Sequence, residues 1–190
     1  MSGSLAGLGG KKHRLRHQGF AQVNQPRPRL VWIGSDGEPA YIEELKSLAA
    51  PSDVSFEPKL RIPDSELVSI LNRAAMMVYA PRLEPFGFAP LEGNACGLPV
   101  VAVAEGGVRE TVVHGVNGLL VEHDPRAVAA AIRQLLDHPD YARQLGENGC
   151  KIVAERWTGE NSVDRLEGRL AEALQVAATT QRRVHVEVDR

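Results

Sequence analysis

The stretch Tyr79–Leu120, YAPRLEPFGFAPLEGNACGLPVVAVAEGGVRETVVHGVNGLL, decides the fold that we predict for this chain of 190 residues. It starts where one apolar run, Met76–Tyr79, ends, and it contains a second, Leu98–Val103. Short continuous apolar runs that end in glycine- or proline-containing segments are typical of strands buried on both faces. The stretch therefore predicts two neighbouring strands of a parallel sheet.

The alternation of strand and helix continues on both sides of this stretch. Further strands are predicted at Leu30–Ile33, Val54–Phe56 and Leu119–Val121. Helices are predicted where apolar residues recur at helical spacing: from about residue 42 to 49, from a cap at Asp64, from Phe88, over Val108–Val112, from Pro125 behind a cap at Asp124, from about Pro139 to Glu155, and from Asn161 to about Ala178. Five alternations with short connections predict an α/β fold, a Rossmann-like doubly wound parallel sheet.

The two ends of the chain carry weaker signals. Residues 1–29 combine glycine, serine, a basic run and two prolines, so we expect an irregular lead-in. Some of those cations could instead meet phosphates. The domain is expected to span residues 30–178. The last segment, residues 179–190, alternates only weakly and is expected to be a disordered tail.

Bulk properties exclude several classes of function. A formal net charge of −2 gives no reason to expect nucleic-acid binding. No apolar run approaches the roughly 20 residues of a membrane-spanning helix, and the N-terminus lacks an apolar signal core. The two cysteines, Cys96 and Cys150, have no metal-ligand or disulfide-framework spacing and are interpreted as small buried hydrophobes. We expect a cytoplasmic protein, with peripheral membrane association as an alternative, and no metal site.

The central stretch places chemistry at the carboxyl edge of the sheet, where open α/β sheets bind ligands. The loop from Glu84 to Phe88 follows one strand, and the helix after it leaves the amides of Gly87, Phe88 and Ala89 without helical partners. Such a helix start attracts anions, and Gly87 permits close approach of a ligand to the backbone.

Two carboxylates accompany this loop, with seven residues between them. Glu92 can accept hydrogen bonds from a vicinal diol such as a ribose, while Glu84 can face another part of the same ligand. The alternative is that both are surface carboxylates favoured near a helix N-terminus. Gly106 and Gly107 follow the next strand; they form either a tight turn or a second patch of amides for phosphate or sugar.

These residues resemble a known family. The motifs Glu84-Pro-Phe-Gly-Phe-Ala-Pro-Leu-Glu92, Gly97-Leu-Pro-Val-Val and Gly106-Gly107-Val-Arg-Glu110 are similar to those of the carboxy-terminal domain of retaining GT-B glycosyltransferases of the group 1 (GT4-like) family, with its Glu-x7-Glu motif. The similarity runs from about residue 30 to 175. It implies the C-terminal half of a GT-B fold.

The resemblance implies a role for each motif residue. The domain would bind a nucleotide-diphospho-sugar: Glu92 would hold the ribose hydroxyls, and Glu84 would contact the transferred sugar as the catalytic residue. The backbone at Gly87, Phe88 and Ala89 would meet sugar and diphosphate, with Gly106 and Gly107 beside it. By positional analogy the nucleobase would lie near Lys59 and Leu60. No cofactor and no bound metal are expected.

The chain also departs from the family pattern. Gln18 stands where a lysine aimed at the diphosphate is expected, and Glu92-Gly93-Asn94-Ala95 replaces the commoner Glu-Ala-Met-Ala. The amino-terminal acceptor-binding domain is missing, so we expect weak or absent transfer by this chain alone. The alternatives are a non-catalytic nucleotide-binding or partner-docking module and another GT-B-like enzyme such as a sugar-nucleotide epimerase. A dinucleotide-binding domain is disfavoured because no G-x-G-x-x-G follows a first strand.

Overall fold

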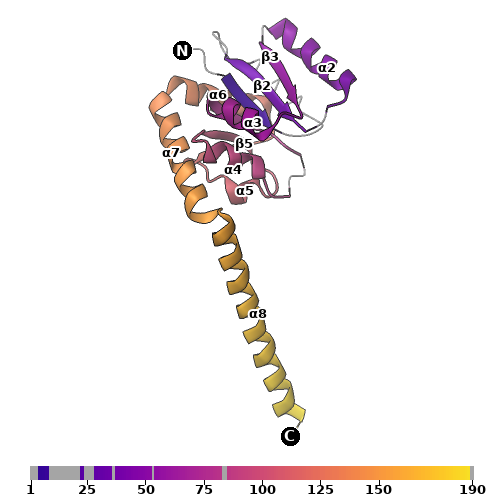
Figure 1. The fold of residues 1–190 in the computed structure, drawn as a ribbon, viewed down its shortest axis with the longest axis vertical. Coiled ribbons are helices and arrows are strands. Elements are labelled where there is room, and N and C mark those ends of the chain that lie inside the picture. The colour runs from indigo at the N-terminus through magenta and orange to yellow at the C-terminus, as the bar shows by residue number, and fades with distance from the viewer. Residues whose placement is uncertain are drawn as a thin grey trace. The chain divides into compact units, whose positions relative to one another are not determined.

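A computed structural model describes residues 4–8, 22–23, 28–35, 37–52, 54–82 and 85–188 (Figure 1). The chain divides into two compact units, Met1–Val153 and Ala154–Arg190. The first unit contains the whole sheet, and the second is helical. The expected domain boundary at residue 178 stays a prediction.

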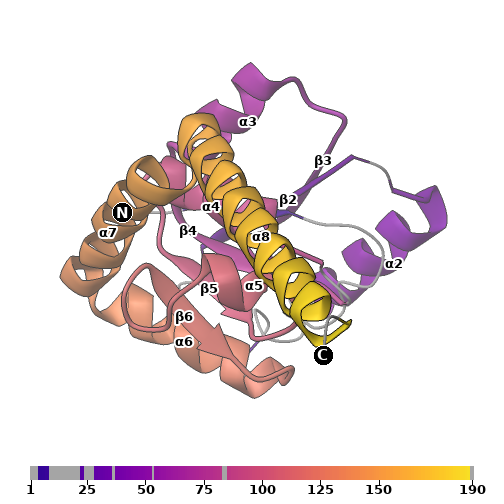
Figure 2. The same cartoon turned by 90° about the horizontal axis from the view of Figure 1, so that it is seen from below.

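The described residues of the first unit form one six-stranded parallel sheet, in the order β3-β2-β1-β4-β5-β6. Figure 2 shows β2 and β3 towards one edge of this sheet and β4, β5 and β6 towards the opposite edge. The strands are β1 (Ser4–Leu8), β2 (Arg29–Gly34), β3 (Phe56–Leu60), β4 (Ala74–Tyr79), β5 (Val100–Val103) and β6 (Gly118–Val121). The reversal of strand order between β1 and β4 makes this a doubly wound sheet, which confirms the predicted fold class.

Both faces of the sheet are buried, and alternate residues of each strand enter different cores. In β4, Met76 and Val78 pack with Ile132 of helix α6 on one face. Met77 packs with Leu71 of helix α3 on the other. The helices of this unit are α2 (Pro39–Ala49), α3 (Asp64–Leu71), α4 (Phe88–Ala95), α5 (Val108–Thr111), α6 (Pro125–Asp137) and α7 (Pro139–Arg156), whose last residues belong to the second unit. Burial on both faces explains why β2, β4 and β5 consist mainly of continuous apolar runs.

The expectation of an irregular lead-in over residues 1–29 is wrong at Ser4–Leu8. This segment is β1, which pairs in parallel with β2 and with β4, Leu5 opposite Leu30 on one side and Met76 on the other. Its sequence, SLAGL, has low strand propensity. Backbone hydrogen bonds to two neighbouring strands do not require a particular side chain, so position in the sheet outweighs composition here. The basic run and Gln18 lie outside the described residues.

Two predicted boundaries between residues 54 and 64 also need correction. The strand expected at Val54–Phe56 is Phe56–Leu60, which contains Pro58. Proline is tolerated because β3 is an edge strand of the sheet, where not every amide needs a partner. Asp64 is the first residue of α3 and not its cap; Pro63 precedes it, and no side chain caps the helix.

The helices α6 and α7 begin as predicted, at Pro125 and Pro139, and the helix after them begins two residues before the predicted Asn161. Asp124 caps α6, since its carboxylate accepts a hydrogen bond from the amide of Arg126 at 3.2 Å. In the second unit, α8 runs from Gly159 to Val188. The expected disordered tail is therefore helical over residues 179–188. The sequence after Gly168 contains no further glycine or proline to end the helix.

Candidate functional site

Two loops meet at the carboxyl edge of the sheet. One joins β4 to α4 and the other joins β5 to α5. They touch at Gly107, where an added Cβ would overlap the carbonyl oxygen of Pro85 and the Cα of Phe86. Both obstacles are backbone atoms and cannot rotate away. The structure thus brings the glycine pair directly against the loop that precedes α4.

The start of α4 has the geometry expected of an anion-binding helix terminus. Gly87 precedes the helix with φ 101° and ψ 55°, a left-handed conformation that favours glycine. A Cβ on Gly87 would also lie only 3.1 Å from the Thr111 hydroxyl oxygen. No side chain caps α4, so the amides of Phe88 and Ala89, in its first turn, have no intrahelical acceptor. Gly106, beside this turn, also has a positive φ, 55°.

An aromatic pair stands at the same helix start. The rings of Phe86 and Phe88 contact edge to face, with centroids 4.9 Å apart and an interplanar angle of 61°. Phe88 is 69% exposed. An exposed aromatic beside uncapped amides offers an apolar surface against which one face of a sugar can lie.

Glu92 lies in α4, one turn beyond this start. The residue is exposed, yet partial burial raises the pKa of its carboxyl above the ordinary value, and the Asp64 carboxylate raises it further. Asp64 belongs to α3, so α3 and α4 both present a carboxyl group here. Glu84, the other carboxylate of the motif, lies outside the described residues, and its proposed role stays a prediction.

The raised pKa of Glu92 implies that the stability of the fold depends on pH. Because the folded-state pKa lies above the ordinary value of 4.5, folding favours the protonated form, and stability falls as pH rises through this window. Glu92→Gln removes the ionised group. We expect its Tm to be slightly higher than that of the wild type at about pH 7 and equal to it at about pH 4. Differential scanning calorimetry at the two pH values measures this; a lower Tm at neutral pH would contradict it.

Lys59 and Leu60, the predicted nucleobase contacts, point to opposite faces of β3. Leu60 packs over the loop after β2, its Cδ1 3.1 Å from the position of a Cβ on Gly37. Lys59 Nζ forms ion pairs with Glu66 Oε1 at 3.1 Å and Glu57 Oε1 at 3.5 Å. The hydrogen bond and charge of Glu66, followed by those of Glu57, raise the Lys59 pKa.

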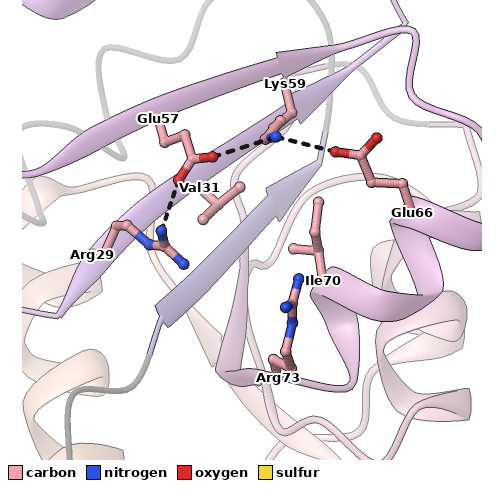
Figure 3. A pocket seen from close by; sticks show the side chains of 7 residues that line it. All are labelled: Arg29, Val31, Glu57, Lys59, Glu66, Ile70 and Arg73. Atoms are coloured by element: carbon pink, nitrogen blue, oxygen red, sulfur yellow. Dashed lines mark hydrogen bonds and ion pairs between the residues drawn. The ribbon is translucent and has the colours of Figure 1, made fainter.

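A pocket of about 190 Å³ lies between α3 and the strands β2 and β3, and Figure 3 shows Lys59 at one end of it. Arg29 also contributes an ion pair there, from its Nη1 to Glu57 Oε2 at 3.0 Å. Arg73 and the apolar side chains of Val31 and Ile70 complete the lining. Both carboxylates of this pocket pair with cations, Glu57 with Arg29 and Lys59 and Glu66 with Lys59. The ammonium of Lys59 is therefore directed to carboxylates of this chain.

Two buried asparagine side chains are hydrogen-bonded to each other next to the site. The sequence did not predict this contact. Asn94 and Asn117 are both fully buried. The Nδ2 of Asn117 donates to Asn94 Oδ1 at 2.8 Å and to the Thr111 carbonyl at 2.9 Å, while its Oδ1 accepts from the Val113 amide at 2.7 Å. The Nδ2 of Asn94 in turn donates to the carbonyls of Leu98 and Asn117. This network fixes α4 and α5 relative to each other.

The departure at Gly93 has a packing reason. A Cβ there would lie 2.8 Å from Met77 Cε and 2.9 Å from its Sδ. Met77 is fully buried in β4, directly beneath α4. Met77 thus occupies the volume that a side chain at position 93 would fill. At position 94, where the commoner family motif has methionine, this chain has a buried asparagine whose side chain is hydrogen-bonded.

Within the described ranges, no group of three or more His, Cys, Asp or Glu side chains is arranged to hold a metal ion. None of the helices in those ranges combines the length and the apolar character that crossing a bilayer requires.

Comparisons with known proteins identify the family. The sequence profile described as "Glycosyl transferases group 1" matches residues 11–152. This chain belongs to the group 1 glycosyl transferases. Among curated relatives, D-inositol 3-phosphate glycosyltransferase of Thermobispora bispora is 37% identical over 139 residues, which are 72% of this chain and 32% of that protein. The human alpha-1,3/1,6-mannosyltransferase ALG2 is 32% identical over 128 residues, 66% of this chain and 31% of that protein.

Solved structures agree on the fold of this group 1 chain. Sucrose-phosphate synthase from Thermosynechococcus elongatus superposes with a TM-score of 0.75 and 28% identity, over 92% of this chain and 46% of that one. Anabaena Alr3699/HepE in complex with UDP superposes with a TM-score of 0.75 and 22% identity, over 92% and 49%. The prediction that this chain has the fold of the C-terminal half of a GT-B glycosyltransferase is confirmed. The chain spans about a third of the length of the curated relatives that it matches.

Proposed function

We propose that this chain binds a nucleotide-diphospho-sugar at the carboxyl edge of its sheet and supplies the donor half of a retaining glycosyltransferase. The observation that carries the proposal is the start of α4. There Gly87 and the uncapped first turn lie against the Gly106–Gly107 turn, one helical turn from Glu92. Amides at a helix N-terminus suit a diphosphate, and a carboxylate beside them suits a polyol.

Each part of the donor has a place in this proposal. The diphosphate and the sugar lie against the backbone at Gly87, Phe88 and Ala89, with Gly106 and Gly107 closing the other side. The ribose diol donates hydrogen bonds to Glu92, and Glu84 contacts the transferred sugar.

The nucleobase lies by the β3 end near Lys59 and Leu60. Because the Lys59 ammonium is paired with Glu66 and Glu57, the base contact there is made by backbone and by Leu60.

HepE has been solved with UDP and with UDP-glucose, which supports a nucleotide-sugar as the ligand class without choosing a base for this chain. The relatives are about twice as long as this chain, so we infer that transfer requires an acceptor-binding domain in addition to the residues present here. We propose that the diphosphate charge is carried by amides and cations of the protein without a bound metal.

A thermodynamic cycle that combines one protein variant with one modified ligand tests the role of Glu92. Glu92→Ala is expected to weaken binding of a nucleoside diphosphate about 10- to 100-fold, the range for losing hydrogen bonds to a charged acceptor. Removing the 2′ and 3′ hydroxyls from the ligand is expected to cost the wild type as much. The same ligand change should cost the Glu92→Ala variant almost nothing, because its partner is already absent. Isothermal titration calorimetry measures all four affinities.

The matched control is Glu147→Ala on the exposed face of α7, which should leave every affinity unchanged. Additive losses in the cycle would show that Glu92 and the diol do not contact each other, and the assignment of Glu92 would then be wrong.

A further inference from the structure

The two cysteines lie far apart in sequence but close together in the fold. Cys96 ends α4, and Cys150 lies in the last turns of α7 that belong to the first unit. The Cys150 thiol donates to the carbonyl oxygen of Ala95 with a distance of 3.8 Å between Sγ and O. That carbonyl belongs to the peptide bond of Cys96, whose Cα lies about 2.8 Å from the oxygen by standard covalent geometry. Cys150 Sγ is therefore within about 7 Å of Cys96 Cα.

Two glycines of α7 hold the helix this close. A Cβ on Gly146 would overlap the carbonyl oxygen of Gly97, and a Cβ on Gly149 would lie 2.5 Å from Asn94 Nδ2. Gly97 follows Cys96 directly, and Asn94 lies two residues before it. The backbone of α7 thus rests directly on the turn that follows α4, and Cys150 is the next residue after Gly149.

The two thiols differ in accessibility. Cys150 is exposed, which corrects the interpretation of both cysteines as buried hydrophobes, and Cys96 is half-buried. Burial raises the pKa of the Cys96 thiol, and the neighbouring Glu92 and Cys150 raise it further. The exposed Cys150 is therefore the thiol that a reagent in solution meets first.

We propose that Cys96 and Cys150 form a redox-active dithiol that a disulfide oxidant such as glutathione disulfide converts into an intramolecular disulfide. The Cys150 thiolate attacks one sulfur of glutathione disulfide, forms a mixed disulfide and releases one glutathione thiolate. The Cys96 thiol then loses its proton and attacks the Cys150 sulfur, which releases the second glutathione. Two protein thiols are oxidised, and one glutathione disulfide is reduced to two glutathione molecules.

Closing the bond needs only local movement. Cys150 Cα lies about 2.8 Å from its own Sγ, so the two Cα atoms are at most about 9–10 Å apart. Disulfide-bonded cysteines have Cα atoms about 4.4–6.8 Å apart, so the turn at the end of α4 must shift by a few ångströms at most. Gly97, in that turn, has φ +73° and open space around its Cβ position. The product would tie α7 to the end of the helix that carries Glu92 and close a loop of about 55 residues, which constrains the unfolded chain.

The test treats the full chain with excess glutathione disulfide under native conditions. We expect both free thiols to disappear, the intact mass to fall by that of two hydrogen atoms, and one peptide pair to link Cys96 with Cys150. The Tm should rise by about 5–10 °C, the range for closing a loop of this size in a domain of this length. Dithiothreitol should reverse every change.

Single variants separate a dithiol from two independent thiols. Cys96→Ser should accumulate a stable glutathione adduct on Cys150, because no second thiol displaces it. Cys150→Ser should react slowly, since only the half-buried Cys96 remains. Glutathione adducts on both cysteines of the wild type, or disulfide-linked dimers without the internal peptide pair, would overturn the proposal. These readouts do not depend on nucleotide binding.

Discussion

Gly107→Ala is expected to destabilise this domain more than a methyl group added at any other glycine of the carboxyl edge. The new Cβ would overlap the Pro85 carbonyl and the Phe86 Cα, and backbone atoms can yield only by separating the two loops. Overpacking against backbone costs about 2–4 kcal/mol. In a chain of this length that corresponds to a Tm lower by roughly 6–12 °C. Thermal unfolding followed by circular dichroism measures the shift.

Gly93→Ala is the matched control for this variant. Its Cβ would also meet atoms closer than 3.0 Å, but they are the terminal Cε and Sδ of Met77. A flexible methionine can move, and alanine gains about 1 kcal/mol of helix propensity over glycine. We expect its free energy of unfolding to stay within about 1 kcal/mol of the wild type. Equal losses from Gly107→Ala and Gly93→Ala would contradict the contact between the two loops.

Asn117→Ala is expected to have the second large effect, a loss of about 3 kcal/mol of stability. It removes three hydrogen bonds and leaves Asn94 Oδ1, the Thr111 carbonyl and the Val113 amide buried without that partner. Unsatisfied buried polar groups cost about 1–3 kcal/mol each, and local relaxation recovers part of the total. Urea denaturation monitored by tryptophan fluorescence gives the free energy of unfolding.

Asn148→Ala provides the comparison. Asn148 makes a single exposed hydrogen bond, from its Nδ2 to the Val116 carbonyl at 3.1 Å. Its loss should cost less than about 1 kcal/mol. If Asn117→Ala were no more destabilising than Asn148→Ala, the buried amide network would not be holding α4 and α5 together.

The sheet could be predicted from sequence wherever its strands are apolar runs. Leu30–Ile33, Met76–Tyr79 and Leu119–Val121 fall within strands β2, β4 and β6, since burial on both faces selects continuous apolar sequence. Ser4–Leu8 was not predicted to be a strand because its small residues form no continuous apolar run. Its pairing partners lie about 25 and 70 residues further along the chain. Pro58 concealed β3, because only knowledge of the strand order shows that it is an edge strand.

The candidate site was predictable in its residues but less so in its geometry. Glycines 87, 106 and 107 were recognisable as a set, yet only the structure shows that Gly107 rests on Pro85 and Phe86. The partnership of Asn94 with Asn117 spans 23 positions, and no local periodicity reports a contact of that kind. Lys59 was expected beside a nucleobase; its ion pairs are with Glu57 of its own strand and with Glu66 of α3, and the second depends on how α3 lies beside the edge strand β3.

The most direct test of a donor-binding site is calorimetric titration of the full chain with UDP, GDP and ADP, each with and without Mg²⁺. We expect saturable binding of one diphosphate without metal, with a dissociation constant near or below about 1 mM. The same titration with Gly107→Ala, at a temperature where that variant remains folded, should show no binding. Absence of binding by the wild type to all three ligands at several millimolar would contradict a donor site at the start of α4.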